Sequence, residues 1–174
     1  MQYPFYTTET ADEALRKFLP KTEYRDTLCA DAVSCICMLV ERLLTLSFPP
    51  DSCALFASRC GALSDHGLDV SLLAGAIAGR FGLSLVRTAD IGLALGRLSP
   101  SCHFVLKTDR NEYLLITGCG PDGLRLLDPS LRKRKGAVRI RPQKKHNESE
   151  YCLVSRDVFL SLAGAAPVCY ILSV

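Results

Sequence analysis

The sequence predicts an α+β protein in which a helical half packs on a mostly antiparallel sheet. The first half carries long apolar runs and apolar residues at helical spacing. After Gly82 the apolar runs become short, of strand length, and are separated by Gly, Pro and Asp. No repeat or long linker divides the 174 residues, which suit one hydrophobic core. We therefore expect a single domain over residues 1–174.

The first two helices are predicted from a cap and from an apolar run. Thr10 and Glu13 have the spacing of a capping box ahead of the amphipathic ALRKFL. The apolar run 28–46 is too long for a strand and predicts a central buried helix, with Asp26 or Thr27 as its N-cap.

The remaining elements follow from local start and stop signals. The segment 49–60 begins with two prolines and predicts one further helix. A second helix is predicted between Asp69, its N-cap, and Gly82, where it ends. In the second half, short helices are expected at 89–98 and 155–164. Strands are expected at 83–87, 102–107, 112–117, 123–128, 137–140 and 167–174.

Composition and termini favour a cytoplasmic protein. The N-terminus lacks the basic and then apolar pattern of a secretory signal, and no apolar stretch approaches the roughly 18 residues that span a bilayer. The nine cysteines are odd in number, and several lie in apolar runs such as AVSCICMLV, where a reduced thiol packs as a small hydrophobic group. We expect reduced thiols, no transmembrane segment and no cofactor.

The order of elements, together with several motifs, resembles the bacteriocin-processing leader peptidases of the papain-like cysteine peptidase superfamily. The resemblance covers about residues 20–174 and implies a papain-like fold, with a buried cysteine-bearing helix packed on an antiparallel sheet. Its three motifs are a cysteine that opens the helix, a pair that opens a strand, and Asp-Pro after the next strand. They fall at Cys29-Ala30-Asp31-Ala32, Glu112-Tyr113 and Asp128-Pro129, with Ile116, Thr117, Gly118, Asp122 and Gly123 also in register.

Cys29 and Asp128 are the catalytic residues that this resemblance implies. A thiol at a helix N-terminus meets unpaired N–H groups and the positive end of the helix dipole, which favour the thiolate. A histidine would then accept the proton, and Asp128 would orient the imidazole.

Three positions depart from the family pattern, and the mildest is Ala30, which stands where the resemblance implies a glycine after the cysteine. Glu112 stands where the resemblance implies the histidine, and Glu23 stands where it implies the glutamine that stabilises the oxyanion. A carboxylate is a weak base at neutral pH, and an anion repels both a thiolate and an oxyanion. We also expect Glu112 to be repelled by Asp128 if the two are close.

These departures predict a catalytically degenerate domain that binds a peptide or protein in the former substrate cleft. The alternative is an active cysteine peptidase or acyl transferase, in which Cys29 is the nucleophile and Asp128 orients a base that the sequence does not identify.

The three histidines do not replace the missing base in an obvious way. In a hairpin closed at 109–111, His103 lies opposite residues 117–118, roughly 17 to 20 Å along the sheet from Glu112. His66 and His146 are interpreted as loop residues, although either loop could carry a displaced base.

Other cysteines have structural interpretations. Cys119-Gly120-Pro121 imitates a nucleophile motif but follows a strand, so it is predicted to form a turn. Cys35 and Cys37 diverge by about 200° on a helix, and no second pair is spaced to meet them, so we expect no metal site.

The basic segment, residues 132–147, is the most uneven feature of the charge distribution. Eight Lys or Arg and no acid lie within 132–145, so the rest of the chain carries +3 − 8 = −5. The segment is either a solvated edge or a site for an acidic protein, nucleic acid or an anionic membrane surface. The absence of interleaved aromatic residues disfavours nucleic acid. The candidate residues are Arg132, Lys133, Arg134, Lys135, Arg139 and Arg141.

Overall fold

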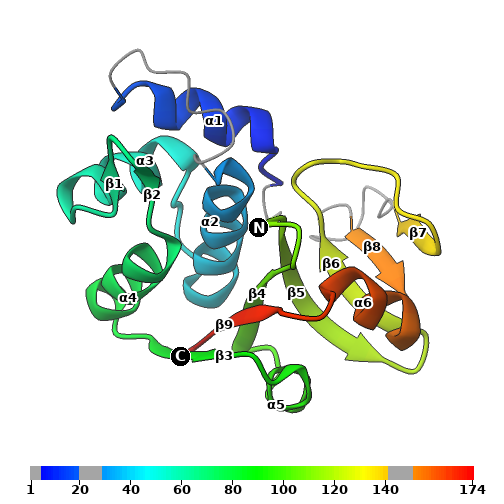
Figure 1. Ribbon diagram of the computed structural model, residues 1–174. Coiled ribbons are helices and arrows are strands. Elements are labelled where there is room, and N and C mark those ends of the chain that lie inside the picture. The colour runs from blue at the N-terminus through cyan, green and yellow to red at the C-terminus, as the bar shows by residue number, and fades with distance from the viewer. Residues whose placement is uncertain (1–4, 20–28, 141–150) are drawn as a thin grey trace.

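The centre of the fold is a seven-stranded antiparallel sheet with helices on both faces (Figure 1). The structure is a computed structural model that describes residues 5–19, 29–140 and 151–174. The predicted α+β class is therefore confirmed. No helix in this described part of the chain is long and apolar enough to cross a bilayer.

The strands follow the order β3-β9-β4-β5-β6-β8-β7, so β9, the last strand, lies between β3 and β4. A separate small sheet pairs two strands of two residues each. The prediction missed this small sheet and β8, because runs of two to four residues carry little periodic signal. The strands are β1 (Leu63–Ser64), β2 (Gly67–Leu68), β3 (Ser84–Thr88), β4 (Cys102–Lys107), β5 (Tyr113–Gly120), β6 (Gly123–Leu127), β7 (Ala137–Ile140), β8 (Tyr151–Val154) and β9 (Val168–Ser173).

The six described helices divide between the two faces of the sheet. The first four lie on one face, and the last two lie on the other (Figure 1). The predicted packing of a helical half on the sheet thus accounts for the first four helices. It did not include the second helical layer on the opposite face. The helices are α1 (Thr8–Arg16), α2 (Ala30–Leu44), α3 (Pro50–Arg59), α4 (Val70–Phe81), α5 (Ile91–Gly96) and α6 (Arg156–Ala163).

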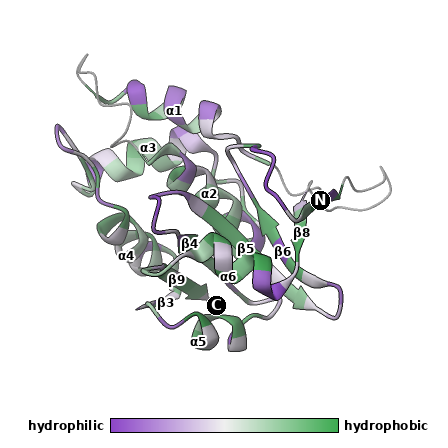
Figure 2. Ribbon diagram, turned by 45° about the vertical axis from the view of Figure 1, so that its right-hand side comes forward, coloured by the Kyte–Doolittle hydropathy of each residue, from purple (hydrophilic) through white to green (hydrophobic). Residues whose placement is uncertain are grey.

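Alternate residues of the central strands enter two separate hydrophobic clusters. In β4, Val105 packs with the cluster on the α2 side, whereas Phe104 and Leu106 pack with the cluster on the α6 side. This follows from the period of two in a strand, which turns successive side chains to opposite faces. Because both faces are covered, the middle parts of the central strands are mostly apolar, which appears as green in Figure 2.

Local capping signals were correct for α4 and wrong for α1. Asp69 caps α4, accepting a hydrogen bond from the N–H of Leu72 at 2.9 Å, and Gly82 ends the helix with φ +67°. The N-cap of α1 is Thr7, whose hydroxyl accepts from the N–H of Thr10 at 3.3 Å. The helix therefore begins one turn earlier than the predicted capping box.

The N-cap of α2 is Cys29, not Asp26 or Thr27 as predicted. Cys29 has a left-handed backbone, with φ +47°, and the helix begins at the next residue. Most of α2 is buried and packs against α1, α3, β4 and β5. The nucleophile candidate is thus directly before the first turn of a long buried helix.

The β4–β5 hairpin has the predicted register. Lys107 pairs with Tyr113 and Phe104 with Ile116, so His103 lies beyond the last of these pairs, at the end of β4 that is remote from Glu112. Glu112 immediately precedes β5, at the hairpin end that lies beside α2.

The predicted turn after the strand is present, but it begins two residues later than Cys119. Cys119 and Gly120 still belong to β5, pairing with Leu124 and Gly123, and the turn is formed by Pro121 and Asp122. Cys119 is an exposed thiol near the end of a strand. It therefore lacks the helix N-terminus that would stabilise the thiolate of a nucleophile.

Candidate functional site

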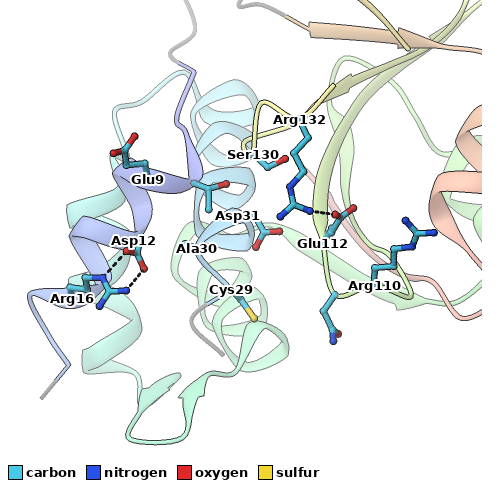
Figure 3. Close-up of a pocket in the computed structure, with 12 residues that line it drawn as sticks. Glu9, Asp12, Arg16, Cys29, Ala30, Asp31, Arg110, Glu112, Ser130 and Arg132 are labelled. Carbon is cyan, nitrogen blue, oxygen red and sulfur yellow. Dashed lines mark hydrogen bonds and ion pairs between the residues drawn. The ribbon is translucent and has the colours of Figure 1, made fainter. Parts of the chain in front are cut away.

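A cavity of about 720 Å³ lies where α1, the start of α2 and the turn before β5 meet (Figure 3). We call it the Cys29 cavity. In Figure 3 the ion pair of Asp12 and Arg16 on α1 lies to one side of the α2 start, and Glu112 with Arg132 lies to the other. The cavity therefore has charged walls on both sides of the thiol.

The Cys29 thiol is half-buried and is not activated by its neighbours. Burial raises the pKa of the thiol, and the nearby charge of Asp31 raises it further. The hydroxyl of Tyr113 donates a hydrogen bond to the sulfur, and this bond and the charge of Lys107 lower the pKa by less. At neutral pH the group is accordingly a thiol.

Asp31 is a site residue that the sequence analysis did not single out. Its Oδ2 accepts from the N–H of Tyr113 at 2.8 Å and its Oδ1 from the N–H of Ala32 at 3.1 Å. Burial raises the pKa of the carboxyl to about 6, the backbone hydrogen bonds oppose that shift, and Glu112 adds to it. In the sequence, an acid in a first helical turn indicates only a favourable interaction with the helix dipole.

Glu112 lines the same cavity as Cys29, but its carboxylate is held by two arginines. Its Oε1 accepts from Arg132, and its Oε2 accepts from Nη1 of Arg134 at 2.8 Å. Both oxygens are thus engaged away from the thiol.

Asp128 is buried and is held by the same arginine. Its Oδ2 accepts from Nε of Arg134 at 2.5 Å, and its Oδ1 accepts from the N–H and the hydroxyl of Ser130 at 3.1 and 2.6 Å. We call the arrangement of Glu112, Arg134 and Asp128 the Arg134 bridge.

The Arg134 bridge corrects the expectation that Glu112 and Asp128 repel each other. A guanidinium lies between the two carboxylates and is only 9% exposed. Burial opposes its charge, but the two carboxylates outweigh this effect and raise the pKa of Arg134. A guanidinium has no acceptor atom, so the group between the two acids cannot take a proton from a thiol.

The remaining predicted site residues lie apart from the cavity or outside the described residues. Asp128 does not line the Cys29 cavity. Glu23 and His146 lie outside the described residues. His103 is buried in β4, where burial and the charge of Arg42 lower its pKa to about 4, and its Nδ1 has no hydrogen-bond partner among the described residues. His66 is exposed in the β1–β2 turn.

The basic segment is not a uniform patch. Arg134 is buried in the bridge and is not available to an outside partner, contrary to the prediction, and Arg132 pairs with Glu112. Arg139 donates to the carbonyl of Leu131 at 3.2 Å, and Arg141 lies outside the described residues.

Metal binding finds no support among the described residues. They contain no group of three or more His, Cys, Asp or Glu side chains that could hold an ion. Cys35 and Cys37 are both buried along α2.

No protein-family model matches the sequence, and no curated protein matches it significantly. The resemblance to leader peptidases thus rests on the order of elements and on the motifs around Cys29, Glu112 and Asp128.

Proposed function

We propose that this chain is a catalytically inactive relative of the papain-like leader peptidases, and that the Cys29 cavity binds a peptide or protein segment without cleaving it. The observation that carries the proposal is the Arg134 bridge. A guanidinium lies between Glu112 and Asp128, where the resemblance implies an imidazole hydrogen-bonded to its orienting acid.

The chemistry of the thiol supports loss of activity. A cysteine nucleophile needs its thiolate at neutral pH and a base that accepts the proton. Burial and Asp31 raise the pKa of Cys29 instead, and no histidine of the described residues lines the cavity.

The dimensions and walls of the cavity support retention of binding. A volume of about 720 Å³ is within the range of ligand sites and accommodates a few side chains of an extended segment. Its lining offers ionic side chains on both sides of the thiol, which suits the polar backbone and mixed side chains of a peptide.

The test is a binding and cleavage assay with fluorescein-labelled peptides that end in small residues. Fluorescence polarisation should detect peptides that bind, and mass spectrometry should find them intact after long incubation. Alkylation of Cys29 with N-ethylmaleimide should weaken or abolish binding, because the adduct projects into the cavity.

A matched control separates this effect from alkylation elsewhere. The reagent also reaches exposed Cys119, so the Cys29→Ser variant alkylated at Cys119 should still bind the peptides. Absence of binding to any peptide, or binding unaffected by the Cys29 adduct, would contradict the proposal. Cleavage that disappears in the Cys29→Ser variant would show an active enzyme.

A second candidate function is that of an active cysteine peptidase or acyl transferase, and one observation favours it. Asp31 interacts with Cys29, and its carboxyl has a pKa of about 6, near the value suited to a general base. In this mechanism Asp31 takes the thiol proton, the sulfur attacks the acyl carbon, and the amine leaves with that proton. Water or an acceptor amine then gives a proton to Asp31 and attacks the thioester, and the sulfur leaves and recovers the proton. Cleavage abolished by both Cys29→Ser and Asp31→Asn would identify it.

The proposal includes a cytoplasmic location. The nine cysteines are all in the reduced state, and six of them are buried. A chain whose core depends on reduced thiols suits a reducing compartment.

A further inference from the structure

A second cavity, of about 700 Å³, lies between the basic segment and α6. We call it the α6 cavity. It shares Arg110, Glu112 and Arg132 with the Cys29 cavity, so the two are neighbours with a common wall. Neither Cys29 nor Asp31 lines it, so its chemistry is separate from that of the thiol.

The floor of the α6 cavity is apolar and closely packed. Gly136 has φ +78°, and a Cβ added there would lie 2.7 Å from Cγ2 of Val158, so the backbone of the basic segment lies directly on α6. Val158 and Leu162, one turn apart on α6, are half-buried and line the cavity. An apolar side chain of a ligand could therefore be covered there.

The rim of the α6 cavity has an excess of positive charge. Five lining residues are cationic and only two, Glu112 and Asp157, are acidic. Arg132 and Arg134 are paired with Glu112, and Arg134 also with Asp128.

Three of these cations have no anionic partner within the described residues. They are Arg110, from the hairpin turn, with Lys133 and Lys135, from the basic segment, and all three are exposed at the cavity. Cations that surround a concave apolar floor attract a ligand that carries both acidic and apolar groups.

We propose that the α6 cavity binds an acidic segment of a partner protein, whose carboxylates pair with Arg110, Lys133 and Lys135 and whose apolar side chain rests on Val158 and Leu162. The proposal does not require that a peptide binds in the Cys29 cavity, although the two cavities share Arg110. The basic segment predicted from the sequence includes Arg134, whose guanidinium is already paired with Glu112 and Asp128. It does not include Arg110, which lies in the turn before β5 and lines the cavity.

The lining favours a protein segment over other polyanions. It contains no aromatic side chain on which a nucleic-acid base could stack. Asp157 and Glu112 interrupt the positive rim and would repel a continuous row of phosphates. A flat membrane surface would also not reach the floor of a concave site.

The experiment measures binding of a short fluorescein-labelled peptide of glutamates and leucines by fluorescence polarisation at low and at physiological salt. Three peptides serve as comparisons. In two of them lysine or serine replaces every glutamate, and in the third serine replaces every leucine. We expect only the glutamate and leucine peptide to bind well. The Lys133→Glu, Lys135→Glu double variant should weaken its binding about tenfold or more.

The matched control reverses two exposed cations on the α4 and β3 side of the fold. The Arg80→Glu, Arg87→Glu variant has the same net charge and should change the affinity by less than about twofold at physiological salt. Thermal unfolding checks that both variants fold. The Asp31→Asn variant, altered in the other cavity, should bind as the wild type does.

Several results would overturn the proposal. Equal weakening by both charge-reversal pairs would show a nonspecific effect of net charge. Unchanged affinity after reversal of Lys133 and Lys135 would exclude the α6 cavity as the site. A single-stranded oligonucleotide or anionic vesicles could bind more tightly than the peptide and lose this binding in the same double variant. That result would show that the α6 cavity binds that ligand and not an acidic protein segment.

Discussion

Arg134 and Asp128 form a buried ion pair, with Nε of the guanidinium 2.5 Å from Oδ2 of the carboxylate. The same guanidinium reaches Glu112 through Nη1 at 2.8 Å. An arginine can serve two carboxylates in this way because its planar fork carries five N–H donors. The pair of Arg134 with Glu112 joins the loop after β6 to the residue before β5, and Glu112 lines the Cys29 cavity.

Replacement of Arg134 by alanine should lower the free energy of unfolding by about 2 to 4 kcal/mol, because it leaves the buried carboxylate of Asp128 without its counter-charge, whereas Glu112 keeps Arg132. Urea unfolding followed by circular dichroism measures the change. The matched control is Lys133→Ala, at an exposed adjacent position, which should alter stability by less than about 0.5 kcal/mol. Equal effects of the two substitutions would contradict a structural role for the bridge.

Asp31 should make the protein less stable as pH rises from about 4 to about 6. Its folded-state pKa is about 6 against the ordinary 3.8, so within this window the folded state holds a proton that the unfolded state has released. The difference of about 2 pH units corresponds to a loss of about 3 kcal/mol, complete above pH 6.

The Asp31→Asn variant tests this linkage. Its stability relative to the wild type should increase by up to about 3 kcal/mol between pH 4 and pH 8, on top of a constant offset from altered hydrogen bonds. Urea unfolding of both proteins over that pH range measures the difference. A difference that does not change with pH would show that Asp31 has an ordinary pKa in the folded protein.

His103 should remain neutral in the folded protein down to about pH 4. Its pKa of about 4 lies below the ordinary 6.5, because burial and the charge of Arg42 disfavour the imidazolium. Between these values the unfolded state binds a proton that the folded state excludes, so this group makes stability fall as pH decreases from about 6.5 to about 4. Its contribution is opposite in sign to that of Asp31.

Nuclear magnetic resonance of histidine-labelled protein measures this directly. The ring resonances of His103 should not move between pH 7 and pH 5, whereas the same residue in urea-unfolded protein should titrate near 6.5. Titration of His103 near 6.5 in the folded protein would contradict the expected burial effect.

Features of the fold that depend on local signals were predictable from the sequence. Asp69 and Gly82 bound α4 as expected because capping and the left-handed C-cap depend on a few adjacent residues. The position of Cys29 beside a long buried helix followed from the length of the apolar run after it. The cap of α1 was misplaced because Thr7 and Thr10 both have capping chemistry, and packing decides between them.

The charge arrangement of the site was not predictable, because it depends on contacts between distant segments. Arg134 lies 22 residues from Glu112 in the chain and 6 from Asp128. A run of cations has the same sequence pattern whether its members are solvated or buried in ion pairs. Only the fold distinguishes Arg134 from its exposed neighbour Lys133.

The Arg134 bridge also determines what a restored histidine could achieve. Glu112→His alone would place an imidazole beside Arg132 and Arg134, whose charges lower its pKa, while Arg134 still occupies the Oδ2 of Asp128. The imidazole would lack its orienting acid, so Cys29 should be alkylated by iodoacetamide no faster than in the wild type.

The double variant Glu112→His, Arg134→Ala removes that competition. Asp128 can then accept from the imidazole, and alkylation of Cys29 at pH 7, followed by mass spectrometry of its peptide, should become several-fold faster. The control is Glu112→Gln with Arg134→Ala, which removes the same ion pairs without adding a base and should leave the rate low. Equal acceleration in this control would show that loosening of the loop, and not the imidazole, exposes Cys29. Equal rates in the single and double histidine variants would show that Arg134 does not block Asp128.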